Sequence, residues 1–346
     1  MAFGARVLKT GIAVTLSLYV SVWFGLNSPV IAAIAAVFAM QPSIYRSWRY
    51  FLEQIQTVFV GSAIALVAGM FFSNEPLAIG IICILVIMIT LMMKMEETVG
   101  LTLVTVIVVM EASGQWVFAL HRFSLIVIGI ASASLINVFF LPPNPKEQFI
   151  GQIRTVFAKI SLLLRTVISD EMKESAYRDE KQELEDALKS LGDKYVLFEE
   201  ELKKLKMAKY RQSRQLVVYK QMLKSVRQGF AVLEVIEQHY FQASRTIQTD
   251  KSFDAHLEQL IKFHEHLFLK YDGKLKPDCT EAERLEAENS LFLEQMGSKM
   301  QDHSHEGNLR LSIVAAAIYD YGYQLGRLDR LVEQYNRNPD EEDEAE

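Results

Sequence analysis

Apolar residues are concentrated in six runs within the first 142 residues, and charged residues hardly interrupt them. Two of the runs, 55–72 and 76–93, have 18 residues each; as helices they would span about 27 Å, close to a hydrocarbon core of about 30 Å. Six such runs so close together are expected in a bilayer rather than in water. The pattern therefore predicts six membrane-spanning helices, within residues 10–26, 28–48, 55–72, 76–93, 99–110 and 123–141.

The second and fifth runs are shorter than the others, and each is the middle run of its group of three. Ser28 and Pro29 have the residue types of a helix N-cap and first turn, and Pro42 interrupts the second run. Because each half would cross the membrane three times, the second half would have the opposite orientation in the membrane to the first. The matched short segments therefore favour a 3+3 inverted repeat with a transport site between the halves. The alternative is that both are ordinary helices lengthened by flanking polar residues, since residues 28–45 alone make 18.

Beyond Pro142 the apolar residues alternate three and four positions apart, a spacing typical of helices that pack side by side. Stripes of this kind cover residues 149–167, 184–205, 216–233 and 311–335, with breaks at 169–175, 249–250, 271–277 and 297–307. The pattern predicts an all-α chain in three parts. These are a six-span transmembrane domain at 1–142, a cytoplasmic helical bundle at 143–338 and an acidic, disordered tail at 339–346.

Composition separates the two portions further. Half of the residues are hydrophobic and 23% are charged, yet residues 1–142 hold only six Lys or Arg and five Asp or Glu. The net charge of −6 therefore belongs to the second portion, and it argues against a nucleic-acid partner. The two cysteines, Cys83 and Cys279, imply no disulfide framework. Apolar runs continue far beyond the first, which argues against a removable signal peptide.

The positive charges predict the orientation of the spans. With the N-terminus inside, the cytoplasmic flanks carry seven Lys or Arg and the outer side only Arg122, the asymmetry expected of a multi-pass protein of the cell membrane. An even number of spans places both termini in the cytoplasm. Lys9 is expected to reach outward to the lipid headgroups. The seven residues are Arg6, Lys9, Arg46, Arg49, Lys94, Lys146 and Arg154.

Two stretches resemble a known family. Residues 11–14 (Gly-Ile-Ala-Val) and above all 41–48 (Gln-Pro-Ser-Ile-Tyr-Arg-Ser-Trp), followed by Glu-Gln-Ile at 53–55, resemble the aromatic acid exporter family of Gram-positive bacteria, within the wider fusaric-acid-resistance-like group. Six spans before a helical domain also resemble plant aluminium-activated malate transporters. The resemblance covers essentially the full length and implies export of aromatic carboxylic acids. It also implies a homodimer, because the chain has one six-span unit where larger exporters of Gram-negative bacteria have more.

Arg46 and Arg49 are candidates for anion binding, together with Gln41 and Tyr45. The two arginines are three residues apart and share one face if the segment is helical. A guanidinium group binds a carboxylate through two parallel hydrogen bonds, so two of them at a cytoplasmic entrance would concentrate organic anions. The alternative is that they anchor the chain to lipid headgroups, with aromatic residues beside them at the interface.

Glu111 ends the fifth run on the outer side and is a candidate proton acceptor for coupled export, with His121 and Arg122 as neighbours. Ionisable groups at membrane depth are candidates for function. The alternative places Glu111 at the membrane interface, where it would have no role in transport.

The histidines of the second portion do not have the spacing of a metal site. His264 falls in an apolar stripe, where a core histidine is the commoner case, and no thiolate or spaced carboxylate completes a ligand set. The basic run within 203–214 indicates a solvated helix face or a contact with anionic lipid. No phosphate-binding loop or nucleophile elbow occurs, so we predict no metal, no cofactor and no enzyme activity. The other histidines considered are His256, His266, His303 and His305.

The sequence therefore predicts a dimeric transporter that exports organic anions, in one version coupled to protons. Its partners would be the anion, membrane lipids and a second copy of the chain. A passive anion channel is one alternative. Another is a membrane-anchored scaffold or sensor whose cytoplasmic bundle binds a partner. Polar and cationic side chains from the second and fifth runs around a cavity would favour transport, and a tightly packed apolar interior would favour anchoring.

Overall fold

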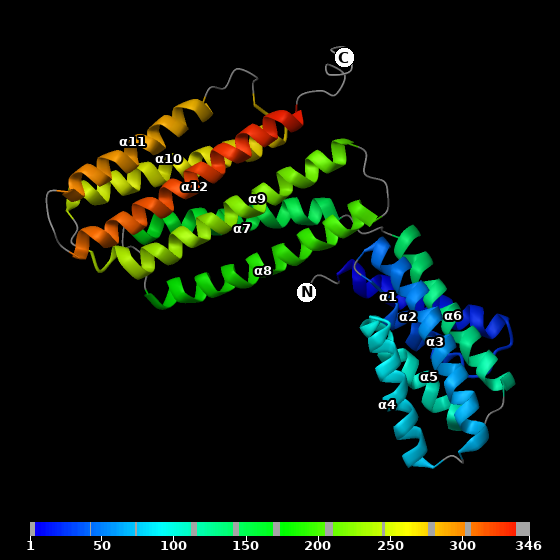
Figure 1. The fold of residues 1–346 in the computed structure, drawn as a ribbon. Coiled ribbons are helices and arrows are strands. Elements are labelled where there is room, and N and C mark those ends of the chain that lie inside the picture. The colour runs from blue at the N-terminus through cyan, green and yellow to red at the C-terminus, as the bar shows by residue number, and fades with distance from the viewer. Residues whose placement is uncertain are drawn as a thin grey trace. The chain divides into compact units, whose positions relative to one another are not determined.

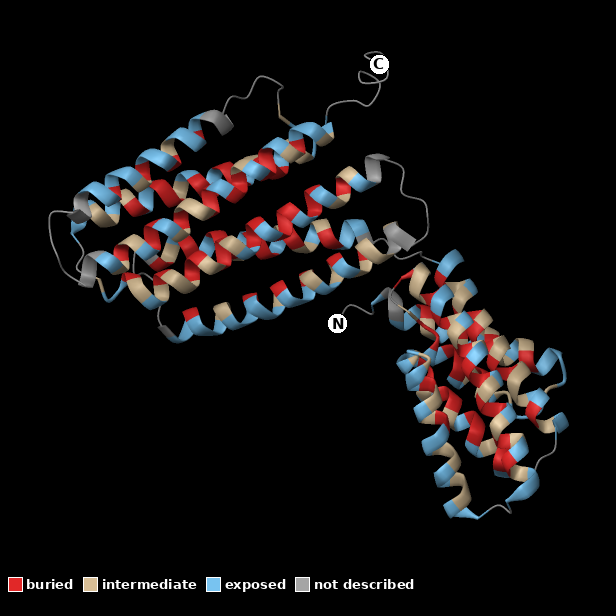
Figure 2. Ribbon diagram, viewed as in Figure 1, coloured by how far each residue is buried: buried red, intermediate tan, exposed pale blue. Residues whose placement is uncertain are grey.

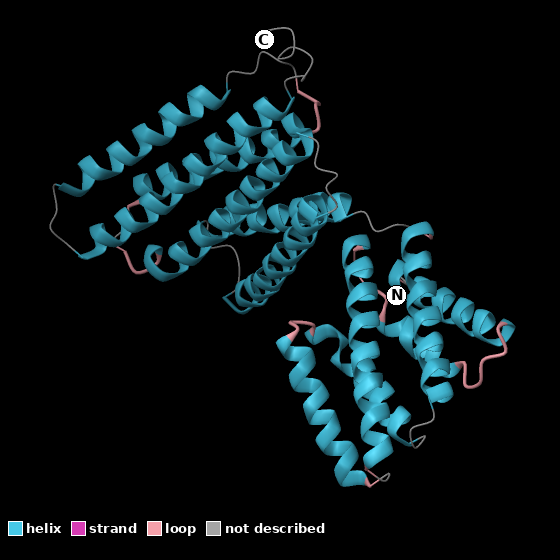
Figure 3. Cartoon of the chain, turned by 45° about the vertical axis from the view of Figure 1, so that its right-hand side comes forward, coloured by secondary structure: helices cyan, strands magenta, loops and turns pink. Residues whose placement is uncertain are grey.

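The structure is a computed structural model that describes residues 4–41, 43–72, 75–111, 116–140, 145–168, 174–204, 210–243, 246–275, 281–301 and 306–336. Within these residues every regular element is a helix (Figure 3), so the predicted all-α class is confirmed. The chain divides into two compact units, Met1–Asn144 and Pro145–Glu346.

Each of the six apolar runs contributes a helix to the first unit (Figure 1). The helices are α1 (Ala5–Trp23), α2 (Val30–Phe38), α3 (Ile44–Phe71), α4 (Pro76–Met92), α5 (Val99–Glu111) and α6 (Trp116–Phe139), with a 3₁₀ turn at Glu96–Thr98 before α5. Tyr45–Phe71 and Trp116–Phe139 are long and apolar enough to cross a membrane, by length and composition, whereas Val7–Trp23 and Pro76–Met92 are apolar but shorter. Six spans therefore stay a prediction.

The second apolar run is divided between two helices. α2 ends at Phe38, and α3 begins at Ile44 instead of residue 55. The Ser43 side chain accepts a hydrogen bond from the backbone N–H of Arg46 at 3.1 Å and so caps the start of a new helix. The interpretation of residues 28–45 as one helix is therefore wrong.

The two middle helices are short, as predicted: α2 has nine residues and α5 has 13. The predicted N-cap of α2 is one residue too early. Pro29 occupies the N-cap position, and Ser28 lies in the connection with a φ of +63°. A residue in this left-handed conformation turns the chain between α1 and α2.

Small residues bring α2 against α6. A Cβ atom on Gly129 of α6 would lie 2.2 Å from the carbonyl oxygen of Ala32 and 2.7 Å from the Cβ of Ala35, so a larger residue would force the helices apart. The buried residues of α2 are Ala32, Ala35 and Ala36. Close backbone approach through small residues is typical of helices that pack inside a membrane.

The outer surface of the first unit is apolar. Figure 2 shows α4 mostly exposed or half-buried along its length. Such a surface is unfavourable in water, and it suits a lipid environment or a protein partner. The exposed large apolar residues of α4 are Leu77, Ile81, Ile84, Leu85, Met88, Leu91 and Met92.

The second unit is a helical bundle with a continuous apolar core. Its helices are α7 (Pro145–Ile168), α8 (Glu174–Lys204), α9 (Tyr210–Val235), α10 (Ile247–Tyr271), α11 (Glu281–Gln301) and α12 (Glu306–Asn336), with a π-helical segment at Ile236–Tyr240 after α9. The predicted stripes supply the core, whose fully buried members include Phe149, Tyr219, Phe253 and Tyr321.

One predicted break in the second unit lies a few residues earlier than expected, between Tyr240 and Ile247. Thr249 and Asp250 lie inside α10, which starts earlier because the Thr246 side chain accepts a hydrogen bond from the backbone N–H of Thr249 at 3.2 Å. The break near 271–277 is found, since α10 ends at Tyr271 and Gly273 follows with a φ of +68°. The acidic tail predicted at 339–346 lies outside the described residues.

Candidate functional site

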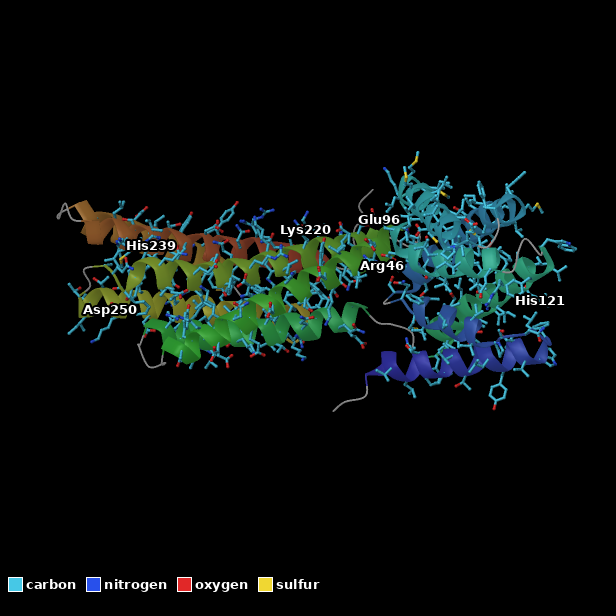
Figure 4. The ribbon with its side chains drawn as sticks, turned by 90° about the horizontal axis from the view of Figure 1, so that it is seen from below. Arg46, Glu96, His121, Lys220, His239 and Asp250 are labelled. Atoms are coloured by element: carbon cyan, nitrogen blue, oxygen red, sulfur yellow. The ribbon has the colours of Figure 1, made fainter. Side chains whose placement is uncertain are left out.

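Arg46 and Arg49 lie one turn apart at the start of α3, so the segment is helical as their shared face requires. Nε of Arg49 pairs with Oε1 of Glu53 at 2.5 Å, and Glu97 is a second acid within electrostatic range. An arginine with acidic neighbours attracts a further anion less strongly. Arg46 is half-buried, and Figure 4 shows it toward the same end of the first unit as Glu96.

A buried hydrogen-bonded network joins α1, α3 and α6 beside these residues. Nδ2 of Asn137 donates to the backbone oxygen of Gln41 at 3.1 Å and to Oγ of Ser47 at 2.7 Å. Oδ1 of Asn137 accepts from Nζ of Lys9 at 3.3 Å. Gln41 thus takes part through its backbone, while Tyr45 is half-buried on the first turn of α3. One amide side chain therefore links three helices and the α2–α3 connection.

Lys9 is the unexpected member of this network. Its side chain is buried with 6% exposure, and among the described residues no carboxylate pairs with it. The prediction that Lys9 reaches the headgroups is wrong, because Asn137 holds the ammonium group inside. A cation in an apolar interior is unfavourable unless an anion or polar groups compensate it, which marks the position as a candidate site.

The sequence held a signal for this inward orientation. Lys9, Ala13, Ser17 and Ser21 recur every fourth residue, which places them on one face of α1, and all four are buried. A face made of small and polar residues indicates a contact with another helix rather than with lipid.

A second polar cluster lies between α3 and α5. Nε2 of Gln54 donates to Oγ1 of Thr102 at 3.2 Å, and that hydroxyl lies 3.0 Å from Oγ1 of Thr57. Oε1 of Gln54 and the hydroxyl of Tyr50, one turn earlier, are buried without a hydrogen-bond partner. Buried polar atoms are nearly always paired, so these two are places where a ligand or a water molecule would complete the bonding.

The interior of the first unit is therefore not uniformly apolar. α5, from the fifth run, contributes the buried side chains of Thr102 and Thr105. α2 contributes only alanines. The polar interior comes instead from α1, α3, α5 and α6, so the predicted contribution of polar side chains from the second run is limited to the α2–α3 connection and the start of α3.

Glu111 and His121 are exposed. Glu111 is the last residue of α5 and lies within electrostatic range of Arg122 on α6. Figure 4 shows His121 at the end of the first unit opposite to Arg46, so the structure does not bring the two predicted groups of site residues together. Exposure favours the interfacial interpretation of Glu111, and the proton role stays a prediction.

His264 is a core residue of the second unit, as its place in the stripe predicted. It is fully buried, its Nδ1 lies 2.7 Å from the hydroxyl of Tyr321, and the rings of Phe157 and Phe268 pack against it. Burial lowers the pKa of His264 to about 3, so the ring is neutral at physiological pH. Its Nε2 has no hydrogen-bond partner.

The other predicted residues of the second unit form no recognisable site. Nε2 of His256 lies 2.9 Å from Oδ1 of Asn289 in the core. Among the described residues, no three His, Cys, Asp or Glu side chains gather as a metal site requires. His303, His305 and part of the basic run lie outside the described residues.

A helical unit with an apolar surface and buried charged and amide side chains has the organisation of a helical membrane protein. The profile of the family described as aromatic acid exporter family member 1 matches residues 1–140. UPF0421 protein YgaE of Bacillus subtilis is 32% identical over 342 residues, which cover 97% of this chain and 96% of YgaE. The chain belongs to the aromatic acid exporter family, and the predicted family is confirmed.

Two further relatives are similar over shorter stretches. UPF0421 protein OB2406 of Oceanobacillus iheyensis is 26% identical over 191 residues, covering 53% of this chain and 55% of its own. UPF0421 protein BH2644 of Halalkalibacterium halodurans is 25% identical over 166 residues, or 47% of each chain. Membership of the family places the chain among membrane transport proteins, in agreement with the expectation that it is not an enzyme.

Proposed function

We propose that the chain is an integral membrane transporter that exports organic anions, aromatic carboxylic acids in particular. The observation that carries the proposal is Lys9, a buried cation held by Asn137 inside an apolar unit, with no carboxylate paired to it among the described residues. In a medium of low dielectric constant such a charge attracts an anion strongly. The family description supports the substrate class and the direction.

In this proposal the anion approaches from the end of the unit that carries Arg46. Arg46 and Arg49 supply positive charge at the entrance, and the pair between Arg49 and Glu53 lowers the net charge there. Gln41 and Tyr45 lie on the path of the anion from this entrance to the network. In the network, the amide of Asn137 and the ammonium group of Lys9 bind the carboxylate. Hydrogen bonds from ionised donors to a carboxylate are about twice as strong as neutral ones.

The proposed topology has six spans, with both termini and the second unit in the cytoplasm. The six helices of the first unit and its apolar outer surface support it, and the short middle helices α2 and α5 are what an inverted repeat would contain. We further propose that two copies form the working dimer, surrounded by membrane lipid. The exposed apolar face of α4 offers surface for either contact.

For coupling, we propose that Glu111 exchanges protons at the outer end, beside His121 and the guanidinium of Arg122. A passive channel would need no such group. Efflux measured with and without a proton gradient separates the two, and a Glu111→Gln variant that keeps the full gradient dependence would exclude the proton role.

Efflux of labelled 4-hydroxybenzoate from proteoliposomes tests the proposed function. Lys9→Gln keeps a hydrogen-bond donor for Asn137 but removes the charge, and we expect at least a tenfold loss of flux, about 1.4 kcal/mol. Lys146→Gln, at an exposed position of α7, is the control and should leave flux unchanged. Arg46→Ala and Arg49→Ala are each expected to reduce flux. Full flux in Lys9→Gln, with normal membrane insertion, would contradict the proposal.

A further inference from the structure

A cavity of about 260 Å³ lies in the first unit between the α1–α2 connection and the first turns of α6. Asn27 and Ser28 line it from the connection, and Val117, Phe118, His121 and Arg122 line it from α6. His121 lies at the end of the unit opposite to Arg46 (Figure 4), so this cavity is separate from the Lys9 network. Its lining combines one permanent cation with an aromatic ring and an aliphatic side chain.

Arg122 presents unused hydrogen-bond donors at this cavity. Its Nε and Nη1 are buried and have no hydrogen-bond partner. Glu111, within electrostatic range, accepts no hydrogen bond from either atom. Buried guanidinium N–H groups are nearly always paired, so these two donors call for an acceptor that the described residues do not supply. An arginine that served only to anchor the chain would keep these donors in contact with water or headgroups.

The ring of Phe118 fixes the position of the guanidinium group. Cζ of Arg122 lies 5.3 Å from the centroid of that ring, within the range of a cation–π contact. Nε and Nη1, at the edge of the same guanidinium group, have no hydrogen-bond partner among the described residues. A planar anion at this edge would meet charge on one side and the apolar side chains of the cavity on the other.

We propose that this cavity binds the carboxylate of a small aromatic acid and is the outer, releasing site of the transport path. The inference rests on the proposed function, because only a protein that exports the anion has a releasing site for it. The guanidinium of Arg122 pairs with the carboxylate, and Phe118 and Val117 contact the ring. Pockets for drug-sized ligands measure about 300–1,000 Å³, so a slightly smaller cavity suits a single-ring acid.

Binding of labelled benzoate to the full chain in phosphatidylcholine nanodiscs tests the inference, in the Lys9→Gln background so that the inner network does not contribute. Arg122→Gln is expected to weaken benzoate binding at least tenfold, and Arg122→Lys less, because lysine keeps the charge but not the planar fork. Val117→Phe, which fills the cavity and leaves Arg122 intact, should also weaken binding. Lys146→Gln should have no effect.

Four results would overturn the inference. The first three are unchanged affinity in both Arg122→Gln and Val117→Phe, equal affinity for neutral benzamide, and no measurable benzoate binding before Arg122 is changed. Loss of benzoate binding in phosphatidylglycerol nanodiscs would overturn it too, since a lipid headgroup would then be the natural occupant. Wild-type efflux measured in parallel keeps the two proposals apart. If efflux is present but benzoate binding does not depend on Arg122, only the inference fails. If binding depends on Arg122 but there is no efflux, the proposed function and the releasing role fail, and the benzoate site at Arg122 stands.

Discussion

At the scale of single residues, burial decides which protonation state a side chain keeps. His264 is enclosed by the rings of Phe157, Phe268 and Tyr321, and within the described part of the chain its imidazole hydrogen-bonds to the hydroxyl of Tyr321 alone. No opposite charge compensates the imidazolium form there, which is why burial lowers the pKa of His264 to about 3. The second unit therefore folds around a neutral histidine.

We expect the second unit to lose stability as the pH falls below about 6.5. There the unfolded chain binds a proton at His264 and the folded chain does not, down to a pH of about 3. The free energy of unfolding then decreases by about 1.4 kcal/mol per pH unit. Hydrogen exchange of peptides from α10 and α12, corrected for intrinsic rates, measures this slope.

His264→Gln is the matched variant, because its amide can still bond to Tyr321 but cannot titrate in this range. Burial also lowers the pKa of His256, so a part of the slope should remain. Identical slopes for the wild type and His264→Gln would show that His264 does not link folding to pH.

The stripe spacing was sufficient to predict that His264 is buried, because a periodic apolar face defines the core side of a helix. The same method failed for Lys9. A lysine at the edge of an apolar run is normally a flanking residue, and its actual partner, Asn137, is 128 positions away in the sequence. Contacts of that range follow from how helices pack, which periodicity within one helix does not specify.

At the scale of elements, hydrophobic pattern predicted which segments are helices, and local capping decided where they begin. Each apolar run is helical, but α3 starts at Ile44 because Ser43 satisfies the backbone N–H of Arg46. Arg46 and Arg49 therefore lie at the start of α3 and not in a segment after the second run. Ser47, which lies between them in the sequence, accepts a hydrogen bond from Asn137 in the buried network.

The crossing of α2 and α6 depends on Gly129. Gly129→Ala is expected to destabilise the first unit by about 1–3 kcal/mol, since its Cβ would lie 2.2 Å from the carbonyl oxygen of Ala32. Thermal unfolding followed by tryptophan fluorescence reports on this unit alone, because Trp23, Trp48 and Trp116 are the three tryptophans of the chain.

Gly80→Ala on α4 is the control, because a Cβ there would meet no heavy atom within 4 Å. It should leave the unfolding temperature unchanged or raise it slightly, as alanine is the better helix former. Equal effects of the two substitutions would mean that the α2–α6 crossing tolerates a side chain and that its close approach is not essential.

At the scale of the whole molecule, composition and the length of the apolar runs were enough to predict an all-α chain, because few solvents other than a bilayer accept so much apolar helix surface. The two candidate sites were harder to predict. Each combines residues from segments far apart in the sequence around one cation, Lys9 in one and Arg122 in the other. We have proposed the Lys9 network as the inner site and the Arg122 cavity as the outer site. An anion that passes from one to the other crosses a membrane only if the two ends of the first unit face opposite sides of it.

The last prediction therefore concerns topology. Figure 4 shows Arg46 and Glu96 toward one end of the first unit and His121 toward the other, and the basic flank at Arg46 predicts that its end is cytoplasmic. In a chain in which Cys83 and Cys279 have been replaced, we expect His121→Cys to react with a membrane-impermeant maleimide on intact cells. Glu96→Cys should react only after permeabilisation.

Each pattern of labelling has a definite consequence for the transport path. Reaction of both cysteines from the same side would mean that the helices between them do not carry the chain across the membrane, and the six-span topology would fail. The reverse pattern, with Glu96→Cys alone reactive on intact cells, would keep the spans but place the Arg122 cavity in the cytoplasm. Lys9 would then lie nearer the outer side, and the proposed sequence of inner capture and outer release would have to be reversed.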